Sequence, residues 1–422
     1  MNDDLLRIDA ARMHATLDAL ARIGATGDGG VRRLAFTPED KAGRDFIEAR
    51  MRALGLDVRI DGLGNLVGLR AGRADGPAVM TGSHLDTVAT GGRYDGAFGV
   101  AAGLEVMATL ADAGVVTRRP LALVAFANEE GARFQPALMG SQVFCGRLPL
   151  ADARARTDAE GVTVADALDA TGYAGPDDLR DLPLHAFVEM HVEQGPVLEA
   201  ARVPVGVVTG VPGITWLRFD FRGETNHAGG TPMELRRDAG YAAACLARHV
   251  REVARALGGL QRATAGRLTF VPNLANVIPG EASVTVDLRN PDAGALREAE
   301  VRLRAFAEAV AAEEGVAVEV RTLVHAPPVA FDAALRAVIA EAAERLGCPA
   351  QALVSGGGHD AGIVADRCPS AMIFVPSVGG VSHSPAEYTR PEDLEAGANV
   401  LLHTLLALAE TDDEAQKNSA PA

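Results

Sequence analysis

A histidine and two aspartates stand close together where an apolar run ends. His84 and Asp86 lie in Gly82-Ser-His-Leu-Asp-Thr-Val, and Asp95 follows in Gly91-Gly-Arg-Tyr-Asp-Gly. Residues two apart in an extended chain point to the same side, which suits a histidine ligand whose tautomer a carboxylate fixes. Glycines beside Asp95 allow the backbone to bend sharply toward an ion. The stretch indicates the start of a metal site, although a simple surface loop is the alternative.

Two adjacent acids, Glu129 and Glu130, directly follow the apolar run 121–128. Two neighbouring carboxylates are unfavourable there unless they are exposed or paired with cations. A solvated strand end is the simpler interpretation. The functional interpretation is that one acid binds metal while the other acts as general base, because adjacent side chains point in different directions.

Two further histidines, His191 and His383, lie in polar segments. His191 is part of Glu189-Met-His-Val-Glu-Gln-Gly, with Gln194 close behind, and His383 is part of Gly379-Gly-Val-Ser-His-Ser-Pro-Ala-Glu. Each histidine taken alone is better explained as a hydrogen-bonded core residue. Together with the carboxylates they favour a site with nitrogen and oxygen ligands, which suits zinc, manganese or cobalt better than a Cys-rich structural zinc site.

A third group of polar residues suggests contacts to an anionic substrate. The segment Asn226-His-Ala-Gly-Gly-Thr-Pro contains His227, Asn276 precedes Ile278-Pro-Gly, and Arg289 ends an alternating strand. An arginine fork can grip a carboxylate with two hydrogen bonds, although strand-end arginines are usually just solvated. The turn Ser355-Gly-Gly-Gly-His-Asp offers backbone N–H groups to an anion near Gly358 and His359, which is a weak signal alone.

Elements that would position these residues alternate between strands and helices. Apolar strands are predicted at 78–82, 121–127 and 371–375, a strand at 185–195, and helices at 99–113, 332–346 and 391–410, with a polar helical section at 151–180. Near-continuous apolar strands are typical of an α/β domain whose mixed, mainly parallel sheet is covered by helices. Ligand sites in such sheets lie beyond the carboxyl ends of strands, where His84 and Glu129 fall.

The pattern changes after Pro212-Gly213. Leu217, Phe219 and Phe221 alternate with charged residues, so this strand has one wet face. Helices are predicted at 233–257 and 295–313 and an alternating strand at 283–289. A chain of 422 residues favours two domains. We therefore expect an inserted α+β domain with an antiparallel sheet at 213–328, a catalytic domain from 1–212 and 329–422, and a disordered tail at 411–422.

Composition excludes several classes of partner. The 40 basic and 56 acidic residues give a net charge of −16 without a dense basic run, which argues against nucleic acid. The uncharged stretch 203–217 is short of the ~20 residues that span a bilayer. The acidic N-terminus is unlike a signal peptide, so we expect a cytoplasmic protein. The four scattered cysteines are expected to be reduced, buried thiols.

The motifs together resemble the amidase/hydantoinase/carbamoylase group of the zinc aminoacylase and peptidase superfamily. That group includes N-carbamoyl-L-amino-acid hydrolases, β-ureidopropionases and allantoate amidohydrolases. The resemblance spans about 80 to 390 and includes, in the family's order, the segments around His84, Asp95, Glu129, His191, His227 and His383. Two departures are Gly230, where threonine is expected, and Gly357, where alanine is usual.

The resemblance implies a role for each candidate residue. One divalent ion (Zn²⁺, or Mn²⁺ or Co²⁺) would be held by His84, Asp95 and His191, and a second by Asp95, Glu130 and His383. Glu129 would activate the bridging water and Asp86 would orient His84. Substrate contacts would come from Gln194, Asn276 and Arg289. His227 would stabilise the oxyanion from across a homodimer.

The reaction implied is hydrolysis of the C–N bond of a ureido group in a small carboxylate substrate, with the inserted domain as lid and dimerisation domain. An N-carbamoyl-L-amino-acid hydrolase is the first expectation, and allantoate amidohydrolase and β-ureidopropionase are alternatives. A dipeptidase or aminoacylase is a more distant alternative. An inactive binding protein is the non-enzyme alternative, which the complete set of ligands argues against.

Overall fold

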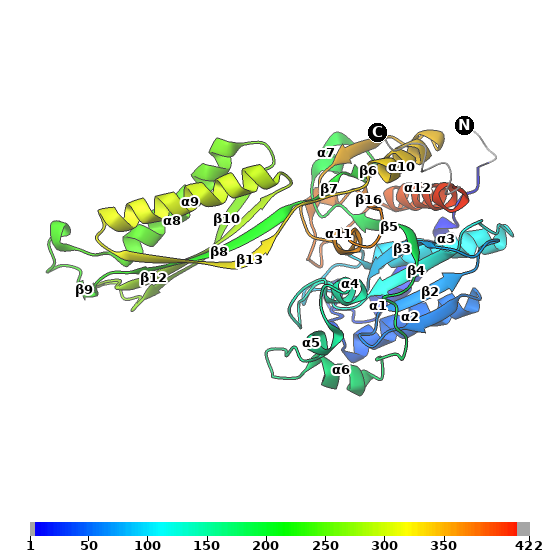
Figure 1. Cartoon of the computed structure of the whole chain (residues 1–422), viewed down its shortest axis with the longest axis horizontal. Coiled ribbons are helices and arrows are strands. Elements are labelled where there is room, and N and C mark those ends of the chain that lie inside the picture. The colour runs from blue at the N-terminus through cyan, green and yellow to red at the C-terminus, as the bar shows by residue number, and fades with distance from the viewer. Residues whose placement is uncertain (1–4, 412–422) are drawn as a thin grey trace. The chain divides into compact units, whose positions relative to one another are not determined.

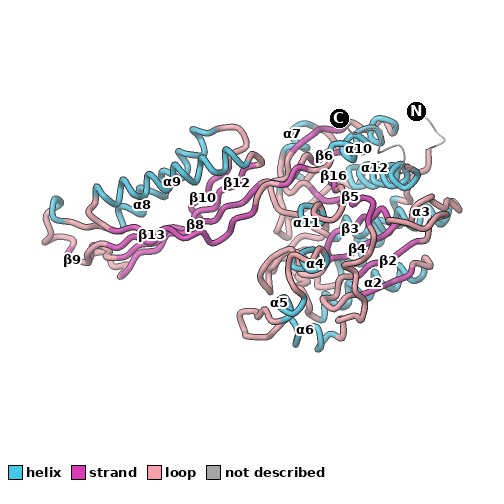
Figure 2. The backbone as a smooth tube through the Cα atoms, in the orientation of Figure 1, coloured by secondary structure: helices cyan, strands magenta, loops and turns pink. Residues whose placement is uncertain are grey.

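The computed structural model describes residues 5–411, which form two compact units (Figures 1 and 2). The first unit contains the described residues up to Thr209 and those from Phe331 onward, and the second is Gly210–Ala330. Disorder was predicted for 411–422, and residues 412–422 lie outside the described part of the chain.

An eight-stranded mixed sheet forms the centre of the first unit, in the order β1-β2-β4-β3-β5-β16-β6-β15. Its middle strands β4, β3, β5 and β16 are parallel, and β1, β2 and β6 add antiparallel pairings. The strands are β1 Asp57–Ile60, β2 Leu66–Arg70, β3 Ala78–His84, β4 Leu121–Phe126, β5 Leu184–Val192, β6 Val205–Val208, β15 Ala350–Leu353 and β16 Ser370–Val375. The mixed, mainly parallel sheet predicted from the apolar runs is confirmed.

The first unit also contains helices, and several of them pack against this sheet. The helices are α1 Ala10–Arg22, α2 Pro38–Ala53, α3 Ala97–Asp112, α4 Met139–Phe144, α5 Leu150–Arg154, α6 Val164–Thr171, α7 Val197–Ala201, α10 Ala333–Arg345, α11 Asp360–Val364 and α12 Pro391–Glu410. The continuous helical section predicted at 151–180 is wrong. α5 ends at Arg154, and a new helix starts only at Val164, where Thr163 and Asp166 form a capping box.

The central strands are fully buried, as their apolar sequences require. Every residue of β3, β4 and β16 is buried. Gly82 shows how closely β3 and β4 approach just before His84: its φ is +142°, and an added Cβ would lie 1.9 Å from the carbonyl oxygen of Val124. Only glycine satisfies both conditions, so this position fixes the end of β3 against β4.

The second unit is a four-stranded antiparallel sheet in the order β10-β12-β8-β13, with two long helices. Its elements are β8 Gly213–Arg222, β10 Arg262–Val271, β12 Glu281–Asn290, β13 Ala317–Ala326, α8 Ala239–Leu257 and α9 Ala293–Glu313. Short strand pairs are β7 Gly210–Val211 with β14 Val329–Ala330, and β9 Asn226–His227 with β11 Val277–Ile278.

The alternation predicted for β8 separates the two faces of this sheet. Leu217, Phe219 and Phe221 are buried in a core shared with α8 and α9. The residues between them are on the open face. The helix predicted from Met233 is wrong at its start, because α8 begins only at Ala239, where the side chain of Asp238 accepts the N–H of Tyr241.

Two compositional expectations are also addressed by the structure. None of the helices in residues 5–411 is long and apolar enough to cross a membrane. All four cysteines are free thiols, but only Cys368 is buried, so the expectation of four buried thiols is wrong for the other three.

Candidate metal centre

The predicted ligands converge at one edge of the eight-stranded sheet. His84 is the last residue of β3, His191 lies near the end of β5, and Glu129 and Glu130 follow β4. His383 lies in the loop that follows β16. These four strands are neighbours and parallel, so their carboxyl ends meet.

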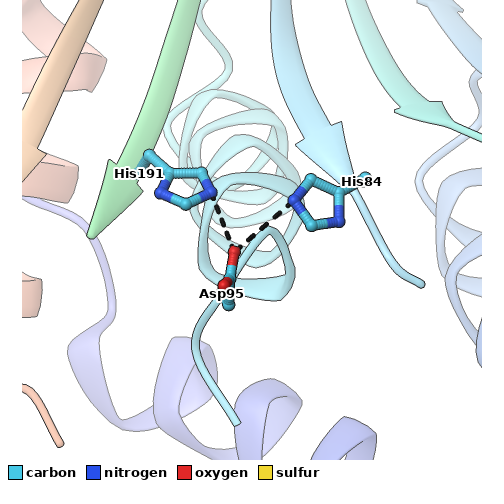
Figure 3. Close-up of side chains that lie close together, drawn as sticks. All are labelled: His84, Asp95 and His191. Atoms are coloured by element: carbon cyan, nitrogen blue, oxygen red, sulfur yellow. Dashed lines mark ion pairs between the residues drawn. The ribbon is translucent and has the colours of Figure 1, made fainter. Parts of the chain in front are cut away.

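A first group of ligand atoms consists of His84, Asp95 and His191 (Figure 3). Oδ1 of Asp95 lies 3.5 Å from Nε2 of His84 and 3.1 Å from Nε2 of His191. Each histidine places its Nδ1 against a backbone carbonyl, that of Asp86 at 2.9 Å and that of Val192 at 2.8 Å. Because a carbonyl can only accept, Nδ1 carries a hydrogen, and Nε2 is the ring nitrogen that faces Asp95 and could bind an ion.

A second group uses the other oxygen of the same aspartate. Oδ2 of Asp95 lies 3.2 Å from Nε2 of His383, and Oε2 of Glu130 lies 3.4 Å from that nitrogen. Oε1 of Glu130 is buried and has no hydrogen-bond partner within residues 5–411. A buried carboxylate oxygen without a donor is unfavourable unless a cation accompanies it. The donor set therefore fits two divalent ions that share Asp95.

Burial, neighbouring charges and hydrogen bonds shift the pKa values of the three acids in different directions. Burial raises the pKa of Glu129 well above its usual value, and the neighbouring charge of Glu130 raises it further. Burial, reinforced by Asp95, raises the pKa of Glu130 to about 7. The pKa of Asp95 lies well below its usual value, because hydrogen bonds from His191, His383 and His84 outweigh its burial.

Asp86 links the segment after β3 to the acidic pair after β4. Its carboxylate accepts the backbone N–H groups of Glu129 and Glu130, each at 3.1 Å. Its own backbone carbonyl is the partner of His84, whereas its Oδ1 is 4.0 Å from the imidazole nitrogen. The contact that holds the ring is thus made by the main chain, while the carboxylate holds the acidic pair.

Sequence reasoning missed Glu387. Its Oε1 accepts the N–H groups of Tyr94 at 2.9 Å and Asp95 at 3.1 Å, and its Oε2 accepts the hydroxyl of Ser382 at 2.8 Å. One buried carboxylate therefore links the loop of Asp95 to the loop of His383. The contact is close at Gly92, where an added Cβ would lie 2.3 Å from Oε1 of Glu387.

Three residues at this edge have a strained backbone conformation. Asn128, Gln194 and His383 have φ of 51°, 56° and 53°, which is the left-handed region that non-glycine residues rarely adopt. Such residues persist where surrounding contacts hold them, and they cluster at functional sites. Gln194 illustrates this, because its Nε2 donates to Oδ2 of Asp95 at 2.8 Å.

The glycine-rich turn reaches the same edge. His359 is buried, its ring centre is 4.6 Å from that of His191, and its Nε2 is 3.0 Å from Oγ of Ser355. Burial and the neighbouring His191 hold the pKa of His359 well below its usual value. Gly358 faces Leu138, whereas a Cβ at Gly357 would meet nothing within 4 Å, so the alanine expected there would fit.

Three candidate substrate contacts belong to the second unit, at two ends of its sheet. His227 and Asn276 are adjacent, since the neighbouring Ala228 donates its N–H to the carbonyl of Asn276 at 3.0 Å. Arg289 lies at the other end of β12, where Asp287 accepts hydrogen bonds from its Nε at 3.1 Å and its Nη2 at 3.0 Å. From Glu281 to Arg289 the strand extends roughly 27 Å.

Comparisons with known proteins agree over most of the chain. Residues 80–407 match the model of Peptidase family M20/M25/M40. An N-carbamoyl-L-amino-acid amidohydrolase from Rhizobium meliloti is 40% identical over 410 residues, which cover 96% of this chain and 97% of that protein. An allantoate amidohydrolase from Bacillus subtilis (strain 168) is 35% identical over 396 residues, covering 93% and 96%.

A solved structure is similarly close. The amidase of the hydantoinase/carbamoylase family from Burkholderia multivorans superimposes with a TM-score of 0.91 at 44% identity, covering 96% of this chain and 98% of that one.

Proposed function

The chain belongs to Peptidase family M20/M25/M40, and from this membership we propose that it hydrolyses the ureido group of N-carbamoyl-L-amino acids. The resemblance to the amidase/hydantoinase/carbamoylase group that the motifs predicted is confirmed by the relatives and by the superimposed structure. The observation that carries the proposal is the convergence of two ligand groups on Asp95 beside the buried acid Glu129.

We assign the metal ligands from this convergence. His84, Asp95 and His191 would hold one divalent ion, and Asp95, Glu130 and His383 a second. Nitrogen and oxygen donors without thiolate suit Zn²⁺, Mn²⁺ or Co²⁺. When bound, the two ions would act as Lewis acids that lower the pKa of the attacking water and polarise the ureido carbonyl.

Glu129 supplies the proton transfers in this proposal. Its carboxylate takes a proton from the attacking water as the C–O bond forms, and returns it to the leaving nitrogen as the C–N bond then breaks. The carbamic acid that remains decomposes and breaks the second C–N bond, so the final products are the amino acid, ammonia and carbon dioxide. Asp86 holds the backbone of Glu129 through the 3.1 Å hydrogen bond, and burial at 8% exposure limits competing water.

Substrate contacts follow from the neighbours of the ligands. Gln194, Gly358 and His359 lie at the metal edge and would contact the ureido group. Arg289 would bind the substrate carboxylate through its guanidinium fork. His227 would stabilise the oxyanion, together with Asn276.

The second unit is proposed as lid and dimerisation domain of a cytoplasmic homodimer. Arg289 and the His227–Asn276 pair are separated by the length of β12, roughly 27 Å at about 3.4 Å per residue. A substrate as small as an N-carbamoyl amino acid cannot reach both ends within one subunit. This supports a complete site in which one subunit provides Arg289 and its partner provides His227 and Asn276.

Replacing Glu129 tests the chemistry. Glu129→Gln keeps the size and the backbone hydrogen bond, so metal content should remain at the wild-type level while ammonia release falls by at least about 10³-fold. The substrate panel should contain N-carbamoyl-L-amino acids, 3-ureidopropionate, allantoate and a dipeptide. Undiminished turnover in this variant would refute the role of Glu129, and turnover of the dipeptide alone would refute the ureido substrate.

Mixing two inactive variants tests the dimer. If His227 serves the partner's site, a heterodimer of Glu129→Gln and His227→Ala subunits has one intact site, and random reassociation should restore about a quarter of wild-type activity. No recovery in verified heterodimers would contradict the exchange of His227.

A further inference from the structure

An apolar patch lies on the open face of the second unit's sheet. It consists of Trp216 on β8 and of Leu323 and Val324 on β13, which are 39%, 51% and 37% exposed. Trp216 is the single tryptophan of the chain. Its neighbours along β8 on this face are Ile214 and Arg218, so the indole ring lies between one apolar and one charged residue.

The strand register places this patch beside Arg289. Trp216 pairs with Asp287 of β12, and Arg289 pairs with Ile214, so Trp216 and Arg289 are diagonal neighbours on one face. Diagonal positions are about 7–8 Å apart, which long and aromatic side chains bridge. The guanidinium of Arg289 is held by hydrogen bonds to Asp287, the residue that pairs with Trp216.

A β-bulge builds the other side of the patch. The register of β13 against β8 shifts between Thr322 and Val324, so that Val324 pairs with Trp216 and Leu323 is the extra residue beside this pair. Bulges bend a strand locally and redirect side chains, and they are common beside binding sites. The bulge therefore adds a second apolar side chain next to the ring instead of the single partner a regular ladder would supply.

The patch also lies at the end of the sheet nearest to the chain connection. Ile214, the partner of Arg289, is four residues after Gly210, where the second unit begins. The opposite end of the sheet carries His227 and Asn276. The patch is thus associated with the carboxylate-binding arginine and not with the oxyanion group.

We propose that Trp216, with Leu323 and Val324, forms the subsite for the substrate's amino-acid side chain, which selects N-carbamoyl-L-amino acids with large apolar side chains. This inference rests on the proposed function, specifically on Arg289 as the carboxylate contact. In an amino-acid derivative the carboxylate and the side chain are bonded to the same α-carbon. When Arg289 binds the carboxylate of a substrate, the side chain of that substrate can therefore contact the neighbouring ring of Trp216.

Side-chain preference is the first readout. The wild-type enzyme should hydrolyse N-carbamoyl-L-phenylalanine and N-carbamoyl-L-leucine with a kcat/KM at least about tenfold above that for N-carbamoylglycine, which is the scale of discrimination an apolar pocket achieves. Trp216→Ala should reduce this preference about tenfold, mainly through KM, and leave N-carbamoylglycine within about twofold. Trp216→Phe should keep most of the preference.

Matched controls separate a subsite from a structural effect. Val301→Ala removes an exposed apolar side chain, 54% exposed on α9 of the same unit, and should leave every kcat/KM unchanged. Thermal unfolding of Trp216→Ala and Trp216→Phe verifies that both variants fold. Equal losses for the glycine and phenylalanine substrates, or an unchanged preference in Trp216→Ala, would overturn the inference.

Fluorescence of Trp216 tests the subsite independently of turnover. Because no other tryptophan contributes, L-phenylalanine or L-leucine added to the metal-loaded enzyme should change the emission at lower concentration than glycine does. If the enzyme hydrolyses none of the N-carbamoyl substrates, the proposed function is refuted. The fluorescence response to the free amino acids then tests the subsite by itself. Identical responses to glycine and L-leucine, or no response, would overturn the inference.

Discussion

Glu387→Gln is a sharp test of how the metal centre is held together. The wild-type carboxylate accepts two backbone N–H groups, from Tyr94 and Asp95, and the hydroxyl of Ser382. Glutamine keeps the shape and can accept with its amide oxygen, but it loses the negative charge. The variant therefore weakens the support of Asp95 without creating a cavity.

The magnitude follows from the hydrogen bonds. A bond to a charged group contributes about 1.5–3 kcal/mol and a neutral one about 1, so each of the two backbone bonds loses roughly 1 kcal/mol. If the roughly 2 kcal/mol total appears as lost preorganisation of Asp95, metal affinity falls about 30-fold, since 1.4 kcal/mol is tenfold. Removing a negative charge near the two ions acts in the same direction.

Metal affinity is measured by competition with a chelating dye, alongside kcat at saturating metal. Glu193→Gln is the matched control. Glu193 is also buried and accepts two backbone N–H groups, from Val197 at 2.6 Å and Leu198 at 2.8 Å, but it bonds none of the proposed ligands. It should lower stability without changing metal affinity. Wild-type metal affinity in Glu387→Gln, or equal losses in both variants, would refute the reasoning.

Two further predictions concern the same centre. Gly92→Ala should reduce metal content and activity about as severely as Glu387→Ala, because its Cβ would lie 2.3 Å from Oε1 of Glu387; a fully loaded, active variant measured by metal analysis would contradict this. Metal removal by a chelator should abolish turnover, and rebinding at pH 7 should release protons. The hydrogen bond to Asp95 raises the pKa of His383 to about 9, so the metal-free histidine is charged below that pH and must lose its proton. Affinity should therefore rise up to about tenfold per pH unit toward pH 9 for each proton displaced. Calorimetry in buffers of different ionisation enthalpy measures this, and binding without proton release at pH 7 would exclude it.

Much of the fold could be predicted from local sequence. Buried parallel strands need apolar residues on both faces, so β4 and β16 were recognisable as continuous runs. The alternation in β8 is likewise a local signal. The start of α8 was misplaced because a capping interaction by Asp238, not helix propensity, decides where that helix begins.

The candidate site was predictable to the level of residue types. Strand ends and glycine-rich turns indicated where His84, Asp95, Glu130, His191 and His383 would lie, and the family motifs implied that Asp95 is shared. Glu387 escaped prediction because its three donors come from two loops nearly 300 residues apart in the sequence. A contact of this kind depends on strand order, which local patterns do not encode.

The sequence by itself determined the chemistry that is available: nitrogen and oxygen ligands without thiolate, an adjacent pair of acids, and an arginine on an alternating strand. Only the tertiary structure decided how these groups are used. It gives each oxygen of Asp95 its own histidine partners, assigns Asp86 to the acidic pair instead of the imidazole, and separates Arg289 from His227 by the length of a strand. The physical reason is that residue type follows from covalent sequence, whereas distance and orientation follow from the order and register in which strands pair.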